Sequence, residues 1–179
     1  VERALRETER LQHTRQVEVQ FKKLSRAVEH SPSSIVITDK NGKIEYVNPR
    51  FTMITGYTTE EAIGRSMRIM KSGKQSAELY RELWDTISSG KEWRGDLCNK
   101  KKSGEHHWES VSISSVTNGG GKIANYIAVK EDITERKNME EAIRRHHDEL
   151  ETLVEERTAR VLGLEQQRVE GEKLAVATR

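Results

Sequence analysis

Residues 34–49 read SIVITDKNGKIEYVNP, and this stretch decides the fold class of the chain. Ser34–Thr38 is β-branched and apolar, which is typical of a strand. Asp39–Gly42 then reads DKNG, and its Asn-Gly step indicates a hairpin turn. The residues after the turn predict the returning strand, in which strict alternation would set Ile44 and Val47 on opposite faces. The sequence therefore predicts a β-hairpin at the start of the folded region.

The segments after this hairpin change from helical to strand patterns. Short helices are expected at Phe51–Thr55 and, with Thr59 as N-cap, at Thr59–Ala62. A longer helix is expected at Ser76–Ser89. Strands are expected at Trp93–Lys101, His107–Thr117 and Lys122–Glu131. Two strands, several helices and three more strands predict an α+β fold, a five-stranded antiparallel sheet with short helices on one face.

Both ends of the chain read as long helices. Residues 1–30 contain no Gly or Pro, and Val17, Phe21, Leu24 and Val28 form one apolar stripe at helical spacing. This stripe suits either a helix folded onto its own domain or one that meets a second chain. The predicted organisation is an amphipathic or coiled-coil helix at 1–30, a compact domain at 31–134 and a coiled coil at 135–179.

The C-terminal helix carries a heptad seam with alternating steps of four and three residues. Its members are Ile143, His147, Leu150, Val154, Arg157, Val161 and Leu164. So narrow a seam needs a partner helix in water, and its polar members restrict register and oligomeric state. We expect a parallel homodimer; the alternative is an isolated charged helix.

Composition excludes several classes of function. Of the 179 residues, 34% are charged, but the formal net charge is only +2, which disfavours nucleic-acid binding as the main task. A single cysteine, Cys98, excludes a disulfide framework and Cys-rich metal sites. No apolar run is long enough to span a membrane, so a cytoplasmic location is expected. No catalytic triad, Walker loop or metal-ligand spacing is present, and we expect neither catalysis nor a metal site.

The central region resembles a PAS domain with its C-terminal PAC segment. The resemblance rests on ITDxxGxIxYVNP at 37–49, TGY at 55–57, Gly64, and YIAVKEDITER at 126–136. It covers more than a hundred residues from about Phe21 to Lys137 and implies the PAS fold. PAS domains bind haem, flavins or small acids, or serve as ligand-free modules.

Further residues are similar to those of flavin-binding, redox-sensing PAS domains. In those relatives, the Trp that matches Trp84 lines the flavin pocket and the Asn that matches Asn99 bonds the polar edge of the ring. The resemblance implies FAD as cofactor, with FMN second, and disfavours haem because 76–89 contains no His. The residues expected to contact the cofactor are Trp84, Asn99, Asn48, Met67, Arg68, Glu109 and Lys130. If Asn99 faces the pocket, strand alternation turns Cys98 away.

Three of these positions depart from the light-sensing relatives. Met67 stands where those relatives place a photoreactive Cys, and a thioether cannot act as that nucleophile. Glu109 and Lys130 stand where they place amides. A lysine at the ring can stabilise a reduced, anionic flavin. Alternatively, both residues face solvent.

The uninterrupted sequence from Lys130 to Ile143 suggests how a signal would leave the domain. The last strand runs through Asp132, Ile133 and Thr134 into the C-terminal helix, and these residues are the expected signalling hinge. The expected function is a redox or oxygen sensor for a histidine kinase. The alternatives are a ligand-free PAS dimerisation or relay module and an input domain of a diguanylate cyclase.

Overall fold

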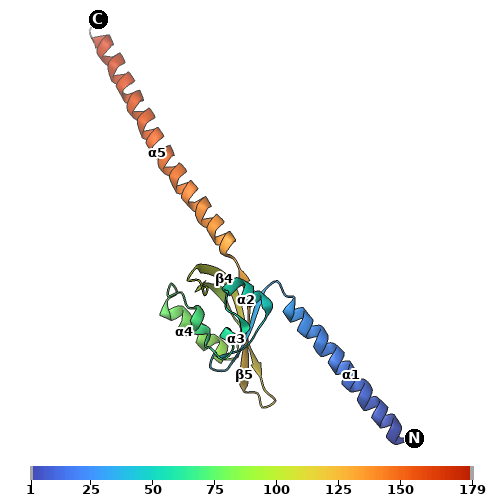
Figure 1. Cartoon of the computed structure of the whole chain (residues 1–179). Helices are drawn as coiled ribbons and strands as arrows, with labels where there is room; N and C mark the ends of the chain where they lie inside the picture. The colour runs from blue at the N-terminus through green and yellow to red at the C-terminus, as the bar shows by residue number, and fades with distance from the viewer. Residues whose placement is uncertain (1, 178–179) are drawn as a thin grey trace. The chain divides into compact units, whose positions relative to one another are not determined.

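The computed structural model describes residues 2–177, so Val1 and residues 178–179 lie outside the described residues. The sheet confirms the α+β prediction: all its strands are antiparallel, in the order β2-β1-β5-β4-β3 (Figure 1). The strands are β1 (Ser34–Asp39), β2 (Ile44–Val47), β3 (Trp93–Lys100), β4 (His106–Thr117) and β5 (Ile123–Asp132).

The hairpin forms as predicted, but one detail of its register differs. Asp39 Oδ1 accepts hydrogen bonds from the backbone N–H groups of Asn41 and Lys43, both at 2.8 Å. Ile44 and Val47 are both buried in the same core cluster, so the prediction of opposite faces is wrong. The pairing of β1 with β2 shifts register at this point, because a β-bulge interrupts the alternation.

Short helices cover one face of the sheet (Figure 1). They are α2 (Pro49–Thr55), α3 (Thr59–Ala62), the 3₁₀ helix η1 (Met67–Met70) and α4 (Ala77–Ser88). The N-cap of α3 is Thr58 rather than the expected Thr59, because Thr58 and Glu61 form a capping box. The sequence patterns did not predict η1, whose N-cap is Ser66.

Two apolar clusters form the core between the helices and the sheet. Phe51 is the largest fully buried side chain among the described residues, and it packs in one cluster with Val36 and Ile44. Leu83 and Ile87 of α4 pack with strand residues in the second cluster. Full burial of a large apolar side chain stabilises the fold by about 1.5–3 kcal/mol.

The terminal helices are α1 (Glu2–Glu29) and α5 (Thr134–Ala177). The chain divides into two compact units, with the boundary between Thr134 and Glu135. The apolar stripe of α1 is exposed at Val17, Phe21 and Leu24. All seven seam residues of α5 are exposed in the single chain, so its pairing stays a prediction. Among the described helices, none is long and apolar enough to cross a membrane.

Candidate ligand-binding site

A cavity of about 650 Å³ lies between the helices and the sheet. That volume is within the range of small-molecule and cofactor sites. Its walls come from the β1–β2 turn, η1, α4 and the three C-terminal strands. The predicted contact residues that line it are Met67, Arg68, Trp84, Asn99 and Lys130. The sequence analysis missed Lys71, Tyr80, Arg81 and Tyr126, which also line it.

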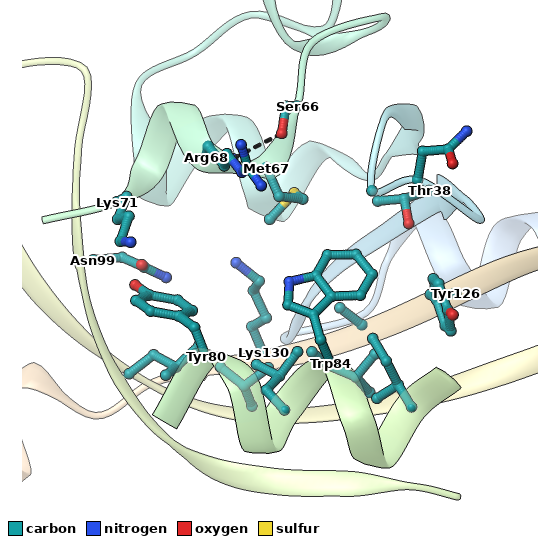
Figure 2. A pocket seen from close by; sticks show the side chains of 18 of the residues that line it. Thr38, Ser66, Met67, Arg68, Lys71, Tyr80, Trp84, Asn99, Tyr126 and Lys130 are labelled. Carbon is teal, nitrogen blue, oxygen red and sulfur yellow. Dashed lines mark hydrogen bonds between the residues drawn. The ribbon is translucent and has the colours of Figure 1, made fainter. Parts of the chain in front are cut away.

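Helix α4 supplies the aromatic wall. Tyr80 and Trp84 stand four residues apart on one helix face and point into the cavity (Figure 2). The Trp84 ring meets the ring of Tyr126 edge-on, with centroids 5.9 Å apart and planes at 83°. A Cβ at Gly42 would lie 3.1 Å from the Trp84 ring, so the turn must carry glycine to let the indole approach. The wall therefore offers flat apolar surface to a ring.

The Tyr80 hydroxyl is a polar group without a protein partner. It is buried, and no hydrogen-bond partner for it occurs among the described residues. Burial raises the pKa of Tyr80 above its ordinary value. A buried hydroxyl of this kind normally finds a partner, and this one lines the cavity, where a ligand can provide it.

Positive side chains stand across the cavity from α4 (Figure 2). Arg68 lies on η1, where its N–H donates to Ser66 Oγ at 3.3 Å. Lys71 Nζ lies 4.2 Å from the centroid of the Tyr80 ring, within cation–π range. With Arg81, these cations line a cavity whose rim would attract an anionic group such as a phosphate.

Two polar strand residues form part of the sheet-side wall. Asn99 of β3 and Lys130 of β5 both line the cavity, and both are buried. Cys98 is buried as well but does not line the cavity, so the predicted alternation of Cys98 and Asn99 is confirmed. Asn99 pairs across the ladder with His107 of β4.

Glu109 lies behind this wall and holds both residues. Its Oε2 accepts a hydrogen bond from Asn99 Nδ2 at 2.6 Å and another from Lys130 Nζ at 3.1 Å. Glu109 is 1% exposed and Lys130 is 3% exposed, so the alternative that they face solvent is wrong. Glu109 itself is not among the residues that line the cavity.

The environment of Glu109 keeps its carboxylate ionised. Burial by itself raises the pKa of Glu109, but the charge of Lys130 and the polar contacts of His107 and Asn99 outweigh it. The pKa of Glu109 is lowered to about 2 as a result. The Glu109 carboxylate is therefore ionised at neutral pH.

His107 is a buried polar residue that the sequence analysis did not single out. Its ring is fully buried, and its Nε2 lies 3.2 Å from Glu109 Oε1. The two atoms are within ion-pair distance but do not have hydrogen-bond alignment. The signal that would have found it is the alternation of His107, Glu109 and Val111 along β4, which puts all three on the inner face.

Asn48 has a structural role. Its side chain accepts hydrogen bonds from the N–H groups of Ile35 and Phe51 and donates to the carbonyl groups of Val28 and Ser33. These four bonds use its polar atoms to cap α2 and to join the end of α1 to the sheet. Asn48 does not line the cavity, contrary to the prediction that it contacts a ligand.

The predicted hinge is tied to β4 next to the buried charges. Asp132 Oδ1 accepts a hydrogen bond from the Thr134 N–H at 2.9 Å, as expected for a helix start. Ile133 N–H donates to the Trp108 carbonyl at 2.9 Å, and Trp108 N–H donates to Thr134 Oγ1 at 2.9 Å. Trp108 stands between His107 and Glu109, so one strand segment contacts both the buried charges and the start of α5.

The comparisons agree with this fold. The family model of the PAS domain matches residues 32–135. The chain therefore belongs to the PAS domain family.

The known proteins that are similar to it include a nitrogen fixation regulator and a histidine kinase. It is 31% identical over 152 residues to the nitrogen fixation regulatory protein of Klebsiella oxytoca, covering 84% of this chain and 31% of that protein. It is 29% identical over 143 residues to a blue-light-activated histidine kinase of Brucella canis, covering 72% of this chain and 29% of the kinase. The chain thus spans about a third of the length of these relatives.

Among solved structures, an RNA-binding light-oxygen-voltage receptor superimposes with a TM-score of 0.64 at 25% identity. The match covers 71% of this chain and 37% of the receptor.

Proposed function

We propose that the chain is a flavin-binding PAS sensor module that reports redox state or oxygen to an output domain. FAD is the first choice of cofactor and FMN the second. The output is proposed to be a histidine kinase, reached through α5 in a parallel homodimer. We assign no catalytic chemistry to the chain itself.

The observation that carries this proposal is the composition of the cavity wall. Trp84 and Tyr126 offer flat apolar surface, and Asn99 and Lys130 offer polar atoms at the sheet side. The unpartnered Tyr80 hydroxyl and the cations Arg68, Lys71 and Arg81 suit a ring that carries polar and phosphate groups. A bound flavin would supply reversible transfer of electrons and protons in this site.

The relatives support the choice of cofactor and output. A solved structure of a light-oxygen-voltage domain with a flavin analogue matches 70% of this chain with a TM-score of 0.58. The resemblance of the sequence to flavin-binding, redox-sensing PAS domains favours redox sensing, and Met67 disfavours a cysteine adduct as the light response. The similarity to a histidine kinase favours that output over a diguanylate cyclase.

Titration of the 179-residue chain with FAD and with FMN tests the binding proposal. Quenching of flavin fluorescence should give saturable binding with one site per chain. Trp84→Ala should weaken binding about tenfold, because an aromatic contact contributes about 0.5–1.5 kcal/mol beyond its buried area. Met53→Ala is the matched control, since Met53 is exposed on α2 and does not line the cavity.

A ligand-free PAS relay is the second candidate. The observation in its favour is that Asn99 and Lys130 already donate hydrogen bonds to Glu109. In that case neither flavin would bind, and the Trp84→Ala variant would behave as the wild type does in the titration. Saturable binding that depends on Trp84 would exclude this candidate.

A further inference from the structure

A single carboxylate oxygen sets the direction of two polar groups in the cavity wall. Glu109 Oε2 accepts from both Asn99 Nδ2 and Lys130 Nζ, at 2.6 Å and 3.1 Å. All three side chains are more than nine-tenths buried. The three residues come from three neighbouring strands, β3, β4 and β5, so the backbone ladder fixes their spacing.

The charge of Glu109 decides which end of the Asn99 amide faces it. An ionised carboxylate can only accept hydrogen bonds, so the amide must turn Nδ2 toward Glu109. No hydrogen bond among the described residues uses Asn99 Oδ1, and Asn99 lines the cavity. Because the pKa of Glu109 is about 2, this orientation holds across the pH range of normal folding. Asn99 therefore offers an acceptor to the cavity.

Lys130 offers the opposite polarity. One of its N–H groups binds Glu109, and Nζ also lies 4.0 Å from Met70 Sδ. An ammonium group has three N–H donors and no acceptor, so its remaining capacity toward the cavity is that of a donor. The wall thus presents an acceptor at Asn99 and a donor at Lys130.

We infer that Glu109 is a positioning residue that makes this wall selective for the imide edge of a ring, where an N–H stands beside a C=O. The inference rests on the proposed flavin function, because the pyrimidine end of an isoalloxazine carries such an edge. The ring N–H would donate to Asn99 Oδ1, and a neighbouring carbonyl would accept from Lys130. Glu109 acts through these two residues and does not contact the ring.

Comparison of FMN with its N3-methyl derivative isolates the ring N–H. Both are titrated against the wild type, Glu109→Gln, and a Glu109→Met/Lys130→Met double variant, each freed of bound flavin. The methyl group adds a steric penalty in all three proteins, so the change in the ratio of the two dissociation constants from one protein to another reports the hydrogen bond. The double variant replaces a buried ion pair with apolar side chains, a change that folded proteins often tolerate.

The wild type should bind FMN more tightly than N3-methyl FMN. In the double variant this preference should be smaller by a factor of at least about ten, because the Asn99 amide is no longer held by Glu109. Glu109→Gln should keep the preference, because Lys130 Nζ can only donate and so turns the Gln oxygen toward itself, where that oxygen can also accept from Asn99. An equal preference in the wild type and the double variant would overturn the inference while leaving flavin binding intact. Failure of the wild type to bind either FAD or FMN would overturn the proposed function and this inference together.

A measurement on the wild type alone covers the case in which the double variant does not fold. The N3–H of bound ¹⁵N-labelled FMN should give a sharp ¹H–¹⁵N resonance that is protected from exchange with water. Disappearance of that resonance through rapid exchange would contradict a hydrogen bond to Asn99.

Discussion

At the scale of single residues, the unusual feature is a charged cluster inside a small α+β domain. Glu109 and Lys130 are buried where a ligand-binding wall needs polar atoms, and each compensates the other. Bringing two charges out of water is costly, and their mutual attraction returns that cost only when the hydrogen bonds are also made. Asn99 supplies the additional bond, so the cluster is held together by all three side chains.

Truncation of Glu109 should therefore be severe. We expect Glu109→Ala to lower the free energy of unfolding by about 3–5 kcal/mol, because it leaves Lys130 buried without its counterion. Urea denaturation followed by circular dichroism measures this loss. Glu131→Ala is the matched control: Glu131 is exposed on β5 beside Lys130, and its loss should change stability by no more than about 0.5 kcal/mol. A similar small effect at both positions would contradict the account of the ion pair.

The same carboxylate gives a component of stability that depends on pH. The pKa of Glu109 is depressed from its ordinary value of 4.5 to about 2 in the folded chain. Its contribution is therefore fully present above the unfolded value and is lost as the pH falls through the folded value. Between about pH 6 and about pH 3, the wild type should lose more stability than Glu109→Gln in urea denaturation. Parallel pH profiles for the two proteins would show that the depressed pKa is wrong.

At the scale of elements, the β1–β2 hairpin supports the aromatic wall as well as the sheet. Gly42 has a φ of +79° and lies against the Trp84 ring, so the turn and α4 constrain each other. A shift of this turn would move the indole that we propose to contact the flavin.

Gly42→Ala should combine backbone strain with a clash. We expect a loss of about 1–2 kcal/mol from the positive φ alone, and weaker FMN binding because the Trp84 ring must move. Gly119→Ala, in the β4–β5 turn, is the control, since Gly119 has no positive φ and no atom within 4 Å of an added Cβ. Thermal unfolding and flavin titration measure both effects. If the two variants had the same unfolding temperature and the same affinity for flavin, the proposed coupling between the turn and the pocket would be contradicted.

The hairpin also shows what the sequence could predict. Turn residues and helix caps are local signals, so the positions of β1, β2 and α4 follow from residues 34–49 and 76–90. The bulge that buries both Ile44 and Val47 depends on pairing with β1, and no local pattern reveals it.

In the site, too, features with a local signal could be predicted and contacts between distant residues could not. The resemblance identified Trp84 and Asn99 as wall residues, and both line the cavity. It did not identify the contact between Glu109 and Lys130, because these residues lie 21 positions apart and meet only when β4 pairs with β5. The bonds of Asn48 to the carbonyl groups of Val28 and Ser33 were hidden for a similar reason, since these partners lie 20 and 15 positions back along the chain.

At the scale of the whole molecule, the two terminal helices present apolar stripes that the single chain leaves exposed. The seam of α5 includes Leu150 and Val154, at 60% and 61% exposure. Helices with so narrow a stripe gain their stability mainly from a partner helix. A sensor of this design would transmit a structural change in β4, through the Ile133–Thr134 junction, to a pair of α5 helices.

Light scattering tests the pairing of α5. The wild type should have twice the chain mass of 20.6 kDa. Leu150→Lys/Val154→Lys should shift the mass toward that of a single chain, because each lysine places a charge in the seam. Ala159→Lys, at the heptad position farthest from the seam, should remain a dimer. A monomeric wild type at micromolar concentration would contradict the coiled-coil prediction.

The central claim is that the cavity behind Trp84 holds a flavin that can be reduced, and the visible absorption spectrum of the purified chain tests it most directly. After saturation with FAD and removal of the excess, the protein should show the two bands of oxidised flavin in the near ultraviolet and the blue. Dithionite should bleach both bands, and air should restore them. A colourless protein after the same treatment would contradict the account.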